Sequence, residues 1–98
     1  MINSLTNHYI VCGFGRVGRG AAAELKEAGV PVVVVDHSPD KVERAIKAGY
    51  LAVLADSTRD ETLRDVNVER ARGLVAALAT DADNLFLILS AKAMNPWL

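Results

Sequence analysis

The sequence predicts an α/β domain in which a parallel β-sheet is covered by helices on both faces. Three observations support this fold class. Short apolar runs alternate with helical patterns along all 98 residues. Residues 31–35 are rich in valine and lack polar alternation, as in strands that are buried on both faces. A glycine-rich turn, residues 13–18, follows the first apolar run and opens the first helical pattern. Together these features predict a Rossmann-type three-layer fold that is truncated after its fourth βα unit.

The first strand and helix flank the glycine-rich turn. Residues 8–12 form an apolar run that predicts a strand. Four apolar residues then recur on one helix face: Val17, Ala21, Leu25 and Ala28. Gly29 follows where a left-handed residue commonly ends a helix. The valine-rich strand comes next and ends at Asp36.

The second helix has clear signals at both ends. Ser38 stands at the N-cap position before Pro39, which suits the first helical position. The helix has an apolar stripe formed by Val42, Ala45 and Ile46. Gly49 closes it, and residues 50–54 predict a third strand.

The third and fourth units follow the same pattern. Thr58 and Glu61 have the spacing of a capping box, which predicts a short helix as far as Val66. Residues 73–79 predict a fourth strand. Thr80 or Asp81 then caps a last helix, which ends near position 94, before an Asn-Pro pair.

The last helix is apolar on every side over residues 85–89. A helix of this kind is normally buried all round. We therefore expect a partner subunit or a further segment of polypeptide to cover it, with packing against the sheet alone as the simpler alternative.

Composition excludes several classes of function. The formal net charge of −1 gives no reason to expect nucleic acid as a partner. The single cysteine, Cys12, is expected to be a reduced residue of the core. No His, Asp or Glu cluster has metal-ligand spacing. Residues 1–7 lack the features of a signal peptide and read as a linker or chain end. No apolar run approaches the ~20 residues of a spanning helix, so we expect residues 8–98 to form one soluble domain.

The glycine-rich turn predicts a nucleotide site because it lies between a strand and a helix inside a βαβ unit. Gly13 allows the tight turn, Gly15 lets backbone approach a diphosphate, and Gly18 permits close helix packing. Free amides at the helix start then face the phosphates. Arg16 can bind phosphate oxygens with its guanidinium, although it also fits a solvated surface arginine. The predicted binding residues of this turn are Gly13, Phe14, Gly15, Arg16, Val17 and Gly18.

Asp36 is the predicted ribose ligand, since it lies 18 positions after Gly18 at the end of the second strand. A 2′-phosphate would meet this carboxylate as a like charge. Neither His37, itself a candidate contact, nor Ser38 supplies a compensating arginine. The expected ligand is therefore NAD(H), ATP, ADP or AMP, and not NADP.

Polar residues also follow the third and fourth strands, where open α/β sheets bind ligands. Asp56 and Ser57 are candidates for contact with the adenine or its ribose, and Thr80 for contact with the phosphates or the distal ribose. The same residue types at the same places also serve as helix N-caps.

Two alternatives to a ligand-sensing domain remain. An NAD-binding fragment of an oxidoreductase would need a proton donor or acceptor over the nicotinamide. Neither His8 nor His37 is placed for that role, and no catalytic constellation is present, which favours a binding module over an enzyme. A dimerisation domain with a vestigial site is the second alternative, and the intact glycines, Arg16 and Asp36 argue against it.

The sequence resembles the RCK or KTN domains (Trk-type N-terminal domains) that regulate potassium conductance. The resemblance starts in the strand and turn of residues 8–18 and continues at residues 34–36, 55–58, 71–74 and 81–84, to end at residues 90–96. It implies a cytoplasmic domain at the membrane that pairs into a homodimer or a higher ring, and that acts on a potassium channel or transporter subunit. It also implies an adenine nucleotide held by Gly13, Gly15, Arg16, Asp36 and Asp56.

Some residues depart from the family pattern. Ala55 replaces a usual glycine, Ser57 a common alanine, and Asn67 a frequent glycine. The family's later strands and its C-terminal ligand-binding subdomain are absent from this chain, which leaves the dimer geometry open.

Overall fold

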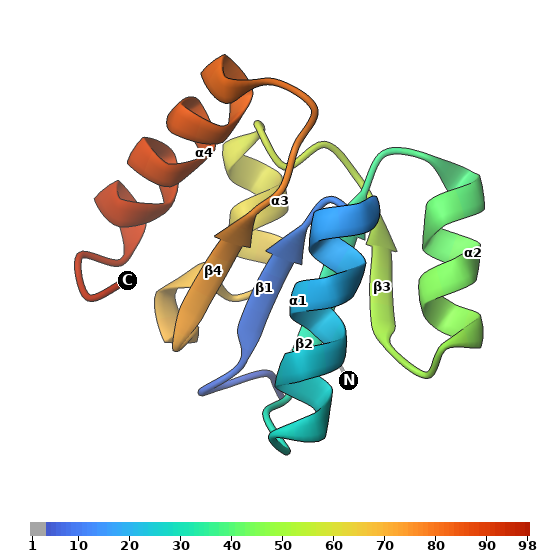
Figure 1. Cartoon of the computed structure of the whole chain (residues 1–98). Coiled ribbons are helices and arrows are strands. Elements are labelled where there is room, and N and C mark those ends of the chain that lie inside the picture. The colour runs from blue at the N-terminus through green and yellow to red at the C-terminus, as the bar shows by residue number, and fades with distance from the viewer. Residues whose placement is uncertain (1–3) are drawn as a thin grey trace.

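A computed structural model describes residues 4–98 as one four-stranded parallel sheet with the strand order β3-β2-β1-β4 (Figure 1). The elements along the chain are β1 (Tyr9–Cys12), α1 (Arg16–Glu27), β2 (Val32–Asp36), α2 (Pro39–Lys47), β3 (Leu51–Leu54), α3 (Asp60–Asp65), the 3-10 turn η2 (Val68–Arg70), β4 (Gly73–Ala76) and α4 (Asp81–Met94). The predicted alternation of strands and helices is confirmed.

β1 lies at the centre of the sheet, and both of its neighbours pair with it in register. Ile10 stands opposite Val33 of β2 on one side and Leu74 of β4 on the other. The chain builds outward from β1 to β3 and then returns to the other side of β1 to form β4. This reversal creates a switch point between β1 and β4, and such points are where open α/β sheets bind ligands.

Each face of the sheet carries its own apolar core. On the face covered by α1 and α2, the buried cluster consists of Val11, Phe14, Ala22, Val32, Val34 and Ala45. On the opposite face, Val33 and Val35 pack with Leu63 of α3 and Leu87 of α4. Successive side chains of a strand point to opposite faces, so the uninterrupted valines of β2 serve both cores. The three-layer arrangement is therefore confirmed.

The helix-end signals are confirmed in part. Gly29 and Gly49 have positive φ angles of 78° and 95°, and the Thr80 hydroxyl accepts the Asp83 amide at 3.1 Å. The predicted capping box at Thr58 is wrong, because α3 starts later, at Asp60, and Arg59 is its N-cap without a side-chain bond.

Two other predictions need correction. The fourth strand is shorter than residues 73–79, since β4 ends at Ala76. Ser38 is the N-cap of α2, but its side chain makes no capping hydrogen bond. Its backbone amide instead donates to Asp36.

The segment before β1 contacts the domain within the described residues. Leu5 belongs to a core cluster and is 9% exposed. The Asn7 amide donates to the carbonyl of Arg70 at 2.9 Å. The remainder of the predicted linker, residues 1–3, lies outside the described part of the chain.

α4 covers the sheet with one side only. Within its apolar run Leu87 is fully buried, whereas four neighbours remain exposed: Leu85, Phe86, Ile88 and Leu89. In Figure 1 this helix lies at the edge of the domain beside β4. Within residues 4–98, none of the helices combines the length and the apolar character needed to cross a membrane.

The contact of α1 with β1 generates the first prediction. A Cβ on Gly18 would overlap the carbonyl of Gly13, whereas a Cβ on Gly20 of the same helix would meet no atom within 4 Å. We expect Gly18→Ala to lower the free energy of unfolding by about 2–4 kcal/mol through overpacking. Gly20→Ala should raise it by about 0.5–1 kcal/mol, because alanine is the better helix former. Urea denaturation of both variants measures the difference, and equal stabilities would contradict the tight contact.

Candidate functional site

A cavity of about 550 Å³ opens at the carboxyl ends of all four strands. This volume falls in the range of small-molecule sites. Its lining consists of Gly13 and Gly15 after β1; Asp36, His37 and Lys41 after β2; Ala55, Asp56, Ser57 and Thr58 after β3; and Ala77, Leu78, Ala79 and Asp83 after β4.

The glycine-rich turn has the shape that the sequence predicted. Gly13 has φ +103°, and a Cβ there would overlap the carbonyl of Ala77. Gly15 also lines the cavity, but a Cβ built on it would meet nothing within 4 Å. The space beside Gly15 is therefore open, and any larger side chain would fill part of the cavity.

The first turn of α1 begins beside this open space. Gly15 is the N-cap and supplies no side-chain acceptor, and the first turn contains no acidic residue. The amides of such a turn lack partners within the helix and carry the positive end of its dipole. Arg16 and Val17 are exposed and lie outside the cavity lining.

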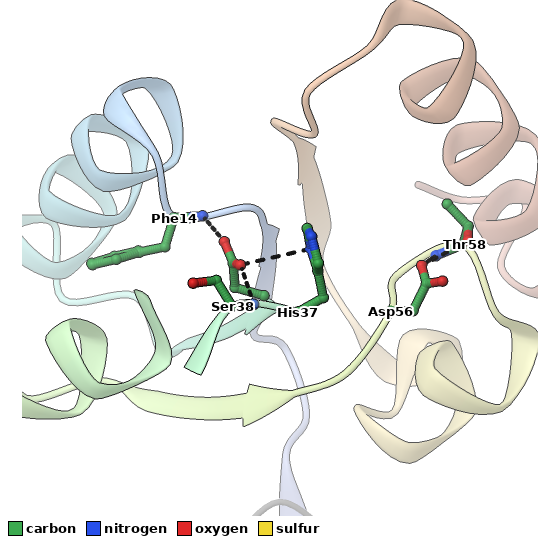
Figure 2. A network of polar contacts seen from close by, with 6 residues as sticks. Phe14, His37, Ser38, Asp56 and Thr58 are labelled. Carbon is green, nitrogen blue, oxygen red and sulfur yellow. Dashed lines mark hydrogen bonds and ion pairs between the residues drawn. The ribbon is translucent and has the colours of Figure 1, made fainter. Parts of the chain in front are cut away.

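The Asp36 carboxylate, which lines the cavity, connects the loops after β1 and β2 through the contacts with Phe14, His37 and Ser38 that Figure 2 draws. Its Oδ2 accepts the Phe14 amide at 2.8 Å, and its Oδ1 accepts the Ser38 amide at 2.8 Å. The His37 Nδ1 lies 3.8 Å from Oδ1 on a side chain that is 84% exposed. Asp36 is only 6% exposed, and each of its two carboxylate oxygens still has a hydrogen-bond donor inside the protein.

A second carboxylate, Asp56, stands at the end of β3 and is also drawn in Figure 2. Its Oδ1 accepts the Thr58 hydroxyl at 2.7 Å and the Thr58 amide at 2.9 Å. These two hydrogen bonds, the hydroxyl first, lower the pKa of Asp56. Because the ionised form is favoured, Asp56 carries a full negative charge at neutral pH.

Ser57 lines the cavity, and its hydroxyl lies close to the buried thiol of Cys12. Burial raises the pKa of the Cys12 thiol to about 11, and the nearby Ser57 hydroxyl opposes the shift. The Ser57 hydroxyl oxygen is itself buried, and no described residue is placed to form a well-aligned hydrogen bond with it. Cys12 thus stays neutral and adds no charge to the cavity.

Six of the predicted site residues meet in the cavity lining: Gly13, Gly15, Asp36, His37, Asp56 and Ser57. The other five lie outside it, namely Phe14, Arg16, Val17, Gly18 and Thr80. Phe14 and Gly18 support the site from behind. The Phe14 ring packs edge-on against Tyr50, with the ring centroids 5.8 Å apart.

Two charged residues of the lining, Lys41 and Asp83, are not among the residues that the sequence predicts to bind the nucleotide. Each lies in the first turn of a helix that follows a strand. That position was the only signal available in the sequence. Of the residues that the structure describes, Lys41 is the only lysine or arginine in the lining.

Neither histidine forms a metal or catalytic cluster. His8 is fully buried, and its Nε2 pairs with the carbonyl of Val66 at 2.8 Å, away from the cavity. Within residues 4–98 no group of three His, Cys, Asp or Glu side chains is arranged to hold a metal ion.

The fold and the crevice define a Rossmann-type domain with the architecture of a nucleotide site. The TrkA-N domain family matches residues 9–97, and the chain belongs to this family.

Several of the relatives bear the names of potassium-transport proteins. The chain is 38% identical over 97 residues to potassium channel protein 1 of Methanocaldococcus jannaschii, covering 97% of this chain and 29% of that protein. It is 37% identical over 89 residues to the glutathione-regulated potassium-efflux system protein KefC of Salmonella paratyphi B, covering 91% of this chain and 14% of KefC. The chain therefore spans less than a third of either relative.

Solved structures show the same fold. The TrkA-N domain of the Escherichia coli inner membrane protein ybaL has a TM-score of 0.90 at 27% identity, covering 97% of this chain and 70% of that one. The Kef CTD of Shewanella denitrificans in its AMP-bound form has a TM-score of 0.81 at 25% identity, covering 94% and 54%. The GsuK channel bound to NAD shares the fold, with a TM-score of 0.84 at 23% identity, covering 97% and 17%.

Proposed function

We propose that residues 8–98 bind NAD(H) or an adenine nucleotide (AMP, ADP or ATP) in this crevice. The proposal rests on one observation: open space beside Gly15, next to the unpaired amides of the first turn of α1. A phosphate placed there meets backbone donors and the positive end of a helix dipole. Arg16 and Val17 contribute these first-turn amides, and the exposed Arg16 guanidinium can fold over a bound phosphate chain.

The adenosine half of the ligand is assigned to the ends of β2 and β3. Each Asp36 oxygen accepts one amide and retains a lone pair, which can accept a ribose hydroxyl. His37 borders the same ribose position. Asp56 and Ser57 line the cavity on the far side of this position, where the adenine would lie. Thr80 does not line the cavity; its hydroxyl caps α4 by accepting the amide of Asp83, which does line it, so its effect on the ligand would be indirect.

The purpose of binding is proposed to be regulation of potassium transport. The relatives named above are a potassium channel protein and a potassium-efflux protein, and a family structure at 25% identity is an AMP-bound form. A regulatory domain of such a membrane protein would act on the cytoplasmic side and respond to nucleotide occupancy. Regulation of this kind requires two states of the domain with different affinities for the nucleotide.

A binding role is favoured over hydride transfer. His37 is the one imidazole in the described lining, and it stands beside Asp36, at the adenosine end. General acid–base catalysis on a nicotinamide would need a proton donor at the opposite end of the dinucleotide. NADH incubated with the domain and a panel of carbonyl compounds should remain unoxidised.

The binding proposal predicts a specific effect at Gly15. We expect Gly15→Leu to weaken AMP, ADP and NADH binding about a hundredfold or more, roughly 3 kcal/mol, because the side chain occupies the phosphate space. Folding stability should fall by only about 1 kcal/mol, since the position has no close neighbour. Isothermal titration calorimetry measures the affinities, and thermal unfolding measures the stability.

The matched control is Gly20→Leu, on the same helix but away from the cavity. This variant should bind as tightly as the wild type. A wild-type domain that binds none of AMP, ADP, ATP and NADH would overturn the proposed function.

The charge beside the ribose predicts a preference for NADH over NADPH. A 2′-phosphate would approach the Asp36 carboxylate, and we expect NADPH to bind about tenfold more weakly. Lys41 tempers this repulsion, because it is the cation that lines the same cavity. Lys41→Met should therefore widen the ratio of the two dissociation constants. Equal affinities of the wild type for NADH and NADPH would contradict the assignment of Asp36.

We also propose that α4 pairs the domain into a homodimer. Its exposed side carries Leu85, Phe86, Ile88 and Leu89, an apolar surface that a second copy can cover. We expect the wild type to sediment as a dimer at tens of micromolar and Phe86→Glu to sediment as a folded monomer. Ile46→Glu, at an equally exposed apolar residue of α2, is the control and should remain a dimer. A monomeric wild type at this concentration would contradict the proposed pairing through α4.

A further inference from the structure

The start of α4 is joined to the wall of the crevice by the side chain of Asn84. Its Oδ1 accepts the backbone amide of Leu78 at 2.8 Å, and its Nδ2 donates to the carbonyl of Leu78 at 3.3 Å. One side chain therefore pairs with both backbone groups of a residue that lines the cavity. Asn84 lies in residues 81–84, one of the segments in which the sequence resembles the RCK or KTN domains.

The backbone of Leu78 has no partner in the sheet. β4 ends at Ala76, and the last bond to β1 joins the Ala77 amide to the carbonyl of Cys12 at 2.8 Å. Backbone groups in partly buried positions need partners, and here Asn84 supplies them in place of a neighbouring strand. The position of the wall at residues 77–79 thus depends on α4.

This wall is in tight contact with the glycine-rich turn. A Cβ on Gly13 would overlap the Ala77 carbonyl and lie 3.4 Å from the Leu78 amide nitrogen. The two segments lie against each other after β1 and β4, and both line the cavity that Gly15 also lines. A displacement of Leu78 would therefore change the shape of this cavity.

Helix capping does not account for the Asn84 contacts. The N-cap of α4 is Thr80, whose hydroxyl accepts the Asp83 amide. The backbone amide of Asn84 is already bonded to the carbonyl of Thr80 at 3.1 Å. The Asn84 side chain is thus directed to Leu78 and not to the helix end.

We infer that Asn84 is a positioning residue for the nucleotide crevice, fixing the wall at Leu78 and making that wall move with α4. The inference rests on the proposed function in that the crevice is taken to hold a nucleotide. It adds a physical link between the bound ligand and the helix that carries the apolar face.

The test compares Asn84→Ala with Asn95→Ala at the other end of α4. Asn95 is 5% exposed, and its Nδ2 donates to the carbonyls of Val68 and Ala71 at 3.0 and 3.1 Å, away from the cavity. Both variants lose side-chain hydrogen bonds to backbone groups: Asn84→Ala loses those with the amide and carbonyl of Leu78, and Asn95→Ala loses those to the carbonyls of Val68 and Ala71. Only Asn84 touches the cavity lining.

We expect Asn84→Ala to raise the dissociation constant for AMP about tenfold, with a smaller loss of melting temperature than in Asn95→Ala. Asn95→Ala should lower the melting temperature and change AMP affinity less than about twofold. A purely structural role would make affinity follow stability in both variants. AMP affinity unchanged in Asn84→Ala, or reduced equally in both variants, would overturn the inference.

Hydrogen exchange of the Leu78 amide separates this inference from the proposed function. The measurement needs no ligand, and exchange should be at least about tenfold faster in Asn84→Ala than in the wild type. Unchanged exchange would overturn the positioning role even if the wild type binds nucleotide. If the wild type binds no nucleotide, the proposed function fails, and faster exchange in the variant still supports the role of Asn84 at the wall.

Discussion

The close approach of three backbone segments at the end of β1 is the constraint on which the site depends. Gly18 of α1 lies against the Gly13 carbonyl, and Gly13 lies against the Ala77 carbonyl. Neither contact leaves room for a Cβ. The absence of side chains at Gly13 and Gly18 brings the helix start and the end of β4 to the same point. Gly15 lies between these two tightly packed glycines in the chain, and the space beside it stays open.

Asp36 has two roles: it holds the loops around the glycine-rich turn in place, and it is the proposed ribose ligand. Its carboxylate holds the amides of Phe14 and Ser38, which belong to the loops after β1 and β2. A buried carboxylate is costly unless it is hydrogen-bonded, and here two amides satisfy it. The same carboxylate is therefore preorganised toward the ribose position before any ligand arrives. Loss of Asp36 would disturb both loops, so Gly15 is the cleaner position at which to test binding.

The sequence was sufficient for the fold because its local signals agree with one another. The valines of β2 and the positive-φ glycines after α1 and α2 all have the structure expected of them. The Thr58 signal failed because the hydroxyl has a nearer acceptor in Asp56, which competes with the helix end. Lys41 and the Asn84–Leu78 contact could not be predicted, since they depend on how separate loops meet in space. The chain pattern also suggested Arg16 as a cavity residue, but the direction in which its side chain leaves α1 is set only by the folded turn.

The charges around the crevice limit how a phosphate can be held. Among the described residues, Asp36, Asp56 and Asp83 line the cavity, and Lys41 is the one lysine or arginine beside them. Hydrogen bonds from Thr58 keep Asp56 ionised, so protonation does not relieve this negative field near neutral pH. Lys41 alone does not balance these carboxylates. Attraction for a phosphate chain would therefore depend on the fixed dipoles of the α1 amides, whose strength varies with distance and direction, together with the Arg16 guanidinium from outside the lining. A site of this type is sensitive to small displacements of its walls, so the link that we infer through Asn84 would let α4 influence nucleotide binding.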